Sequence, residues 1–194
     1  QEIIRNLSES FVPDLLALYP GISYGLEGAS QDERKLISEL WLALVAALFM
    51  IYALIAIPLR SYSQPLLIMS VIPFGAIGAI FGHVVMGKAI SMFSLFGLFA
   101  LAGVVVNDSL IMVDFINKAR AKGVAVRQAV IESGAQRFRA IILTSFTTAA
   151  GLLPILFETS SQAQYVIPTV ISISFGIVFA TVITLLLVPS LNML

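Results

Sequence analysis

The chain has 194 residues, 59% of them hydrophobic and 11% charged. Its mean hydropathy of +0.99 excludes an ordinary soluble domain, in which about a quarter of the residues are charged. Eleven basic and eleven acidic residues cancel, so no net charge points to nucleic acid, and the lack of cysteine excludes a disulfide framework and a thiolate metal site. The composition predicts a protein that has membrane lipid as its main solvent.

Residues 1–30 form the one stretch with the composition of a soluble segment, and we interpret them as the end of an extramembrane region. Tyr19, Pro20 and Gly21 predict a turn, and residues 22–26 alternate apolar with small or polar side chains, as in a strand. A helix is expected to begin near Ser30 and to continue into the first apolar run. Because the chain opens on Gln1 without a signal peptide, we expect it to be part of a longer protein.

Five apolar runs follow, each near the ~20 residues that a helix needs to cross a bilayer. The predicted fold is therefore an all-α membrane protein with five spans over residues 31–194. Strands of a β-barrel would alternate every second residue, which these runs do not. Gly75, Gly78 and Gly82 are spaced for close helix packing in lipid. The spans are expected at residues 39–58, 65–86, 90–116, 140–157 and 166–188.

The charges between the runs predict the orientation of the chain. The first connection carries Arg60 without an acid, the second carries Lys88, and the fourth carries Glu158 without a base. The positive-inside rule places the first and third connections in the cytoplasm, so the N-terminal segment is expected outside. Val126, Ala129 and Val130 have the spacing of a short helix on the membrane surface. The third connection, residues 117–139, carries one acid, Glu132, against Lys118, Arg120, Lys122, Arg127, Arg137 and Arg139.

Asp108, in the third run, is the strongest candidate for chemistry. It lies six residues before Asp114, which places it ~9 Å further into the span. An aspartate at such depth raises the free energy of membrane insertion by ~2.5–3.5 kcal/mol, so we expect it to have a function. Apolar surroundings favour the protonated acid, as a proton carrier requires. Ala100, Gly103 and Asn107 form a narrow stripe beside it that would let a partner helix approach. The alternative is a neutral, hydrogen-bonded packing residue.

The fourth run supplies two possible partners for Asp108. Arg137 lies at its basic end, and Thr144 follows seven residues later on the same face. Because the third and fourth spans run in opposite directions, Thr144 is expected at about the depth of Asp108. Arg137 could equally be one more basic residue that only sets the orientation of the chain in the membrane. Thr144 could hydrogen-bond to the backbone of its own helix.

The other polar residues of the spans indicate no enzyme and no cofactor. His83 stands alone in an apolar run, so a structural hydrogen bond is the preferred interpretation. The methionines do not repeat on one helical face, and we find no Ser/His/Asp set, phosphate loop or metal-ligand spacing.

Residues 97–117, GLFALAGVVVNDSLIMVDFIN, resemble the tenth transmembrane helix of resistance-nodulation-cell division (RND) exporters, with the hydrophobe and amphiphile (multidrug) efflux branch as the nearest match. Residues 137–145, RFRAIILTS, and 151–154, GLLP, resemble the start of the eleventh helix. Residues 175–181, FGIVFAT, and 187–190, LVPS, resemble the twelfth. Residues 19–24, YPGISY, are similar to the end of the last porter subdomain, so 1–30 would be periplasmic.

This resemblance implies a proton-driven antiporter of the bacterial inner membrane that exports drugs or other amphiphiles. It implies a homotrimer, built with the N-terminal half of the same pump and assisted by a periplasmic adaptor and an outer-membrane channel. The family relay joins two aspartates of the fourth helix, in that other half, to a lysine of helix ten and an arginine and a threonine of helix eleven. By position, Arg137 and Thr144 match the last two.

The position of the family lysine holds Asn107, followed by Asp108. This Asn-Asp pair resembles the aspartate pair of the first half, so Asp108 is expected to carry or share the proton. The predicted relay set is Asp108, Asn107, Arg137 and Thr144. Two other readings stay open. One is an exporter of metal ions, lipids or protein in the same superfamily, and the other is a membrane scaffold without a transport cycle.

Overall fold

The computed structural model describes residues 11–18 and 29–193. The turn and strand expected between residues 19 and 26 lie outside the described residues. The chain divides into two compact units, Gln1–Ala43 and Leu44–Leu194. Within the first unit, α2 (Val12–Leu18) is a two-turn helix. Helix α3 (Ala29–Leu59) contributes residues to both units and confirms the helix predicted to start near residue 30.

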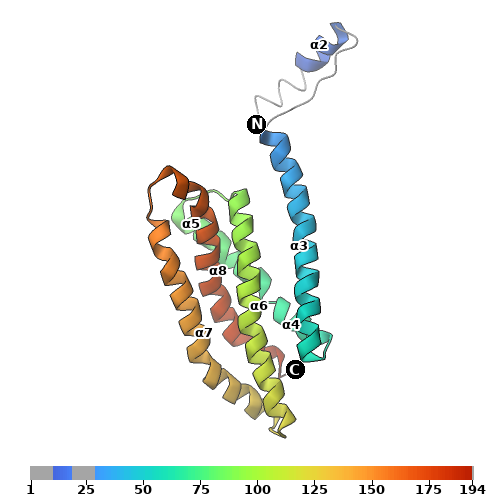
Figure 1. The fold of residues 1–194 in the computed structure, drawn as a ribbon, viewed down its shortest axis with the longest axis vertical. Helices are drawn as coiled ribbons and strands as arrows, with labels where there is room; N and C mark the ends of the chain where they lie inside the picture. The colour runs from blue at the N-terminus through green and yellow to red at the C-terminus, as the bar shows by residue number, and fades with distance from the viewer. Residues whose placement is uncertain (1–10, 19–28, 194) are drawn as a thin grey trace. The chain divides into compact units, whose positions relative to one another are not determined.

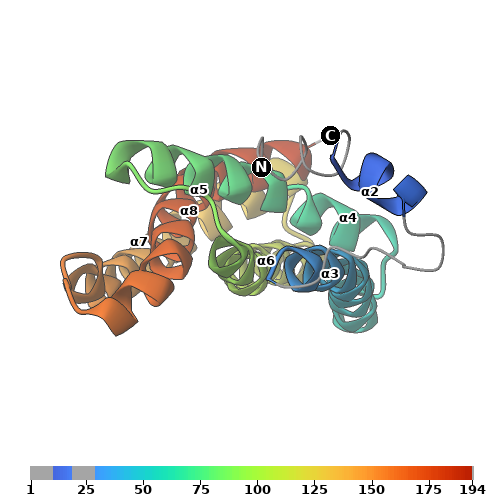
Figure 2. The same cartoon turned by 90° about the horizontal axis from the view of Figure 1, so that it is seen from above.

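The second unit continues with α4 (Ser63–Met69), α5 (Ile72–Met86), α6 (Met92–Ala121), α7 (Val126–Leu156) and α8 (Ser161–Leu191). Together with the end of α3, these helices give five segments long and apolar enough to span a membrane, which confirms the predicted all-α fold with five spans. Helix α8 packs against α5, α6 and α7 and so holds the unit together (Figures 1 and 2).

The second span is broken where the sequence predicted one continuous helix. Helix α4 ends at Met69 and α5 begins at Ile72, with Pro73 in the first turn of α5. Proline has no backbone N–H to donate to a preceding turn, and its ring restricts the residue before it. The span therefore restarts as a new helix, in which Gly75 donates to the Val71 carbonyl at 3.3 Å.

The predicted third connection is mostly helical, which corrects the expected loop at residues 117–139. Helix α6 continues to Ala121 and α7 begins at Val126, so the linker is Lys122–Ala125. Val126, Ala129 and Val130 belong to the start of α7 and not to a separate surface helix. Figure 1 shows α7 curving away from α6 after these first turns. Charged side chains do not end a helix, because α-helix formation needs no apolar surface.

Glycine allows close contacts between helices of the core. Gly78 and Gly82 of α5 lie directly against Phe175 and Phe179 of α8. Gly75 lies against Leu101 of α6. These contacts confirm the close packing predicted from the glycine spacing, since a side chain at these positions would push the helices apart. At the end of α5, Gly87 adopts φ +62°, the left-handed conformation that closes a helix at little steric cost.

Candidate functional site

Asp108 lies on the inner face of α6. It is one helical turn from Val105 and one from Met112, both of which are buried. Asp108 as a residue is 8% exposed, and its side chain makes no hydrogen bond and no ion pair within the described residues. The neighbouring Ser109 does not donate a hydrogen bond to Asp108, because its hydroxyl donates to the Val105 carbonyl at 2.9 Å. The structure thus confirms the expected burial and leaves the carboxyl group without a partner from the part of the chain that is described.

The stripe of Ala100, Gly103 and Asn107 flanks Asp108 and is exposed along its length. A Cβ added at Gly103 would have no atom of another residue within 4 Å. Asn107 makes no hydrogen bond within the described ranges. The small residues therefore leave an open strip on α6 beside a buried acid, and small side chains are what allow a second helix to approach closely.

Thr144 does not reach Asp108. It is exposed on α7, and its hydroxyl donates to the Ala140 carbonyl at 2.7 Å, the backbone bond that was the alternative interpretation. The residue that joins α7 to its neighbour is Ser145. Its hydroxyl lies 2.5 Å from that of Thr181 on α8, and Thr181 donates in turn to the Ile177 carbonyl at 2.8 Å.

Arg137 contacts α6 near its basic end. The guanidinium carbon lies 5.1 Å from the centre of the Phe115 ring, in cation–π geometry. Its Nε atom is buried and finds no acceptor among the residues that the structure describes. Asp114, beside Phe115, pairs with Lys118 at 2.6 Å instead, and this pair is largely exposed. Arg137 therefore retains donors for a partner that these residues do not supply.

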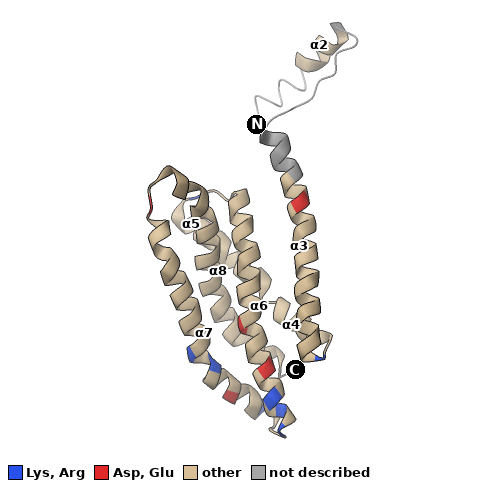
Figure 3. Ribbon diagram, in the orientation of Figure 1, with Lys and Arg blue, Asp and Glu red and all other residues tan. Residues whose placement is uncertain are grey.

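Charge divides the second unit into two unlike ends. Lys and Arg residues cluster along the chain where α6 ends and α7 begins, close to Asp114 and Glu132 (Figure 3). At the opposite end, Lys88 donates to the Gln164 side chain at 3.0 Å, and Glu158 accepts from the backbone of Thr159 and Ser160. Asp108 is the one acid placed along the apolar part of α6.

His83 has the structural role predicted for it. It is 3% exposed, with Nδ1 2.9 Å from the Ala79 carbonyl and Nε2 2.8 Å from the Ser94 hydroxyl. Nδ1–H donates to the carbonyl, and Nε2 accepts from Ser94. This bond links α5 to α6. Groups of three or more His, Cys, Asp or Glu residues arranged to hold a metal are absent from the described ranges.

Sequence reasoning missed two polar links between helices. Besides the Ser145–Thr181 contact, Gln64 of α4 and Asn117 of α6 exchange two amide hydrogen bonds, at 3.0 and 2.8 Å. The partners are 36 and 53 residues apart in the sequence. No local spacing signals such a pair, since each residue alone is typical of a helix end or of a back-bonded hydroxyl.

Comparison with known proteins places this chain in a family. Residues 8–194 match the AcrB/AcrD/AcrF family. The swarming motility protein SwrC of Bacillus subtilis (strain 168) is 30% identical over 169 residues, which are 87% of this chain and 16% of SwrC. The multidrug resistance protein MdtC of Yersinia pseudotuberculosis serotype O:1b (strain IP 31758) is 32% identical over 186 residues, 95% of this chain and 18% of MdtC. The chain thus spans about a sixth of the length of these relatives.

Among solved structures, a heavy metal efflux pump in crystal form I has a similar fold, with a TM-score of 0.74 and 23% sequence identity. The match covers 97% of this chain and 19% of that one. The five apolar helices, the length of the family match and the level of identity all indicate the same family. The chain belongs to the AcrB/AcrD/AcrF family and is a multi-pass segment of the membrane domain of an RND efflux transporter.

Proposed function

We propose that this protein exports drugs or other amphiphilic compounds across the bacterial inner membrane by proton antiport. The observation that carries the proposal is the Asp108 carboxyl group, buried in α6 and without a partner among the described residues. An acid in the apolar part of a span costs ~2.5–3.5 kcal/mol, so a protein that only needed a packed helix would gain from replacing it. A transport cycle offers a reason to keep it, because an acid can take up a proton on one side and release it on the other.

Asp108, Asn107, Arg137 and Thr144 are the proposed relay residues. The exposed stripe beside Asp108 would receive a helix from the remainder of the transporter, and Asn107 would offer it an amide. Arg137 has a buried, unpartnered Nε atom that would pair with an acid of that helix. The Thr144 hydroxyl is exposed and can still accept a hydrogen bond while it donates to Ala140. In this arrangement the relay is completed by residues that lie outside this chain.

The substrate class is proposed from the relatives and from the motifs. Two kinds of relative share about a third of the aligned residues, one named a multidrug resistance protein and the other a swarming motility protein. The solved heavy metal efflux pump, at 23% identity, supports the fold alone. Export of metal ions, lipids or protein is the alternative within the superfamily, and a non-transporting scaffold is the alternative outside it.

The proposed assembly follows from the family resemblance. The chain would work as one part of a homotrimer, together with the N-terminal half of the pump, a periplasmic adaptor and an outer-membrane channel. Residues 1–30 would then be the end of the periplasmic porter region, and the basic linker between α6 and α7 would face the cytoplasm.

Replacing Asp108 tests the proposal directly. Asp108→Asn keeps the size and the hydrogen-bonding capacity of the side chain and removes its titration. In liposomes that contain the intact transporter, an imposed pH gradient should drive efflux of ethidium by the wild type. In Asp108→Asn the efflux rate should fall at least tenfold, to the level without a gradient.

Asp114→Asn is the matched control, since Asp114 lies on the same helix and its carboxylate is exposed and paired with Lys118. This variant should keep most of its efflux. Normal gradient-driven efflux by Asp108→Asn would contradict a relay role for Asp108. Wild-type liposomes that move Zn²⁺ and never ethidium would favour the metal alternative.

A further inference from the structure

Thr184, in the last third of α8, is a buried hydroxyl residue that makes no hydrogen bond. It is 1% exposed, and its hydroxyl has no hydrogen-bond partner within the described residues. Thr181, one turn earlier, donates to the carbonyl four residues before it and lies against Ser145 of α7. Buried polar groups in proteins are normally hydrogen-bonded. The Thr184 hydroxyl is therefore free to bond a residue of another helix.

The packing of α6 against α8 fixes the level of Thr184. The two helices run in the same direction (Figure 1). A Cβ added at Gly97 of α6 would lie 2.7 Å from the Ser172 Cβ, and one added at Gly176 of α8 would collide with the Leu101 side chain. In both pairs the α8 residue comes 75 positions after the α6 residue, and each helix advances by four residues between the pairs. Ridges of every fourth residue are a common way for helices to pack. The same register continues with Val105 opposite Ala180, Ser109 opposite Thr184 and Val113 opposite Val188, all of them buried.

Asp108 borders the space into which Thr184 packs. A side chain at a helix contact fits between four residues of the facing helix, spaced i, i+3, i+4 and i+7. Opposite Thr184 these are Val105, Asp108, Ser109 and Met112, and all four are buried. Ser109 already donates to the Val105 carbonyl, whereas Asp108 has no partner among the described residues. A hydrogen bond to an ionised carboxylate is roughly twice as strong as one to a neutral group. Asp108 is therefore the favoured partner of Thr184.

We propose that Thr184 is a positioning residue for Asp108, with its hydroxyl hydrogen-bonded to the Asp108 carboxyl group on the inner face of α6. The two side chains are unbonded in the structure, and the bond forms by a change of side-chain rotamer, without a movement of the helices. The proposal rests on the proposed function, because Thr184 positions Asp108 for proton transfer only if Asp108 carries the proton. It adds a residue of α8 on the buried side of Asp108, whereas Asn107 lies on the exposed side.

A hydroxyl group suits a carboxyl group that gains and loses a proton. It can donate its hydrogen to the ionised carboxylate, and its oxygen can accept the O–H of the protonated acid. Thr184 keeps its own proton in both states, so the transported proton enters and leaves at the Asp108 carboxyl group alone. An acid that is bonded in both states keeps one position through the cycle. Proton transfer gains from this, because the reacting groups are held in a fixed geometry.

Infrared difference spectroscopy tests this contact without transport. The intact transporter in liposomes is compared at low and at high pH, and the C=O band of protonated Asp108 is identified by its loss in Asp108→Asn. Thr184→Val replaces the hydroxyl group with a methyl group of similar size. It should shift the Asp108 band, because the hydrogen bonding of the acid changes. Thr184→Ser keeps the hydroxyl group and should leave the band in place.

Efflux measurements test whether the contact positions Asp108. Under an imposed pH gradient, Thr184→Val should lower the maximal rate of ethidium efflux about three- to tenfold, the loss expected for one hydrogen bond. The ethidium concentration at half-maximal rate should not change, since Thr184 holds the acid and not the cargo. Thr184→Ser should restore most of the rate. Ser109→Ala is the control, because it removes the other polar neighbour of Thr184. It should leave both the efflux rate and the Asp108 band unchanged.

An Asp108 band that Thr184→Val leaves in place would overturn the proposal. So would equal losses of efflux in Thr184→Val and Thr184→Ser, which would point to packing instead of hydrogen bonding. If the band does not shift while Asp108→Asn abolishes efflux, the Thr184 proposal falls and the transport proposal stands. If the band shifts while Asp108→Asn exports normally, the transport proposal falls and the contact stands.

Discussion

Gly97 of α6 should be among the positions least tolerant of a methyl group. A Cβ at residue 97 would lie 2.6 Å from the Thr169 carbonyl oxygen and 3.1 Å from the Thr169 Cα atom. Both are backbone atoms of α8 and cannot rotate away. Ordinary contact begins near 3.4 Å, so α6 and α8 would have to separate by about 0.8 Å. One turn earlier, the Thr169 hydroxyl donates to the Phe93 carbonyl at 2.7 Å, and this bond would lengthen.

Two opposing effects set the change in the free energy of unfolding of Gly97→Ala. Overpacking by one methyl group costs about 1–3 kcal/mol. Alanine in place of glycine stabilises a helix by about 1 kcal/mol, because alanine has the higher helix propensity. Gly97→Ala should therefore reduce the free energy of unfolding by up to about 2 kcal/mol. For a chain of this size, 1 kcal/mol shifts the unfolding midpoint by about 2–4 °C, so a fall of up to about 8 °C is expected.

Gly103→Ala provides an internal reference on the same helix. A Cβ at Gly103 meets no atom of another residue within 4 Å, so this variant gains the helix preference without the clash. Both variants gain the same helix propensity, so the difference between their unfolding midpoints should reflect the overpacking cost alone. Heat-induced unfolding in detergent, followed by circular dichroism, measures both. Equal midpoints for Gly97→Ala and Gly103→Ala would refute the close α6–α8 contact.

Ser94→Ala should leave His83 Nε2 buried without a donor and cost about 1–3 kcal/mol in the same unfolding assay, and an unchanged midpoint would show that water or another group replaces Ser94. The basic linker between α6 and α7 is predicted to face the cytoplasm. In this cysteine-free chain, Ala125→Cys should resist an impermeant thiol reagent added outside intact cells, and Thr159→Cys, at the opposite end of α7, should react. Gly123, in the same linker, is a poorer site for cysteine, because its φ of +85° strains any residue other than glycine. Labelling of Ala125→Cys from outside and protection of Thr159→Cys would mean that the topology is inverted.

The number and approximate position of the spans could be predicted from the sequence, because a helix satisfies its own backbone hydrogen bonds and needs only ~20 apolar residues to be stable in lipid. Glycine spacing predicted the packed face of α5, and an isolated histidine predicted a structural hydrogen bond. These features are local. The break before Pro73 and the extension of α6 and α7 through the basic connection were not predicted, because the length of an apolar run does not fix the length of a helix.

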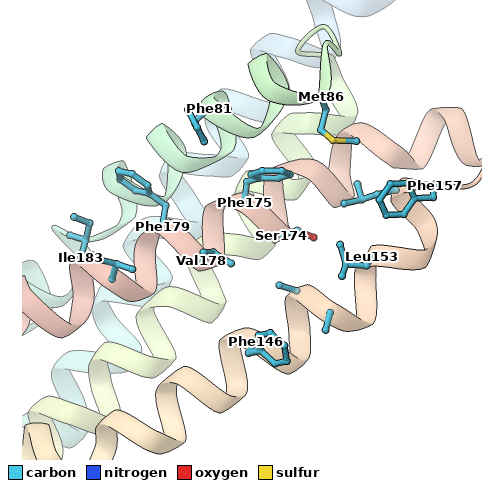
Figure 4. A pocket seen from close by; sticks show the side chains of 14 residues that line it. Phe81, Met86, Phe146, Leu153, Phe157, Ser174, Phe175, Val178, Phe179 and Ile183 are labelled. Carbon is cyan, nitrogen blue, oxygen red and sulfur yellow. The ribbon is translucent and has the colours of Figure 1, made fainter.

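The inward or outward direction of each residue was decided only by the tertiary structure. In water a helix reveals its buried face by its apolar stripe, but lipid tails are as apolar as leucine, so a span is apolar all round. Asp108 faces inward and Thr144 outward, although the sequence placed them at one depth as partners. The links from Gln64 to Asn117 and from Ser145 to Thr181 join residues distant in the sequence. An apolar pocket of about 500 Å³ likewise forms only where side chains of α5, α7 and α8 come together (Figure 4), and no local pattern in the sequence predicts it.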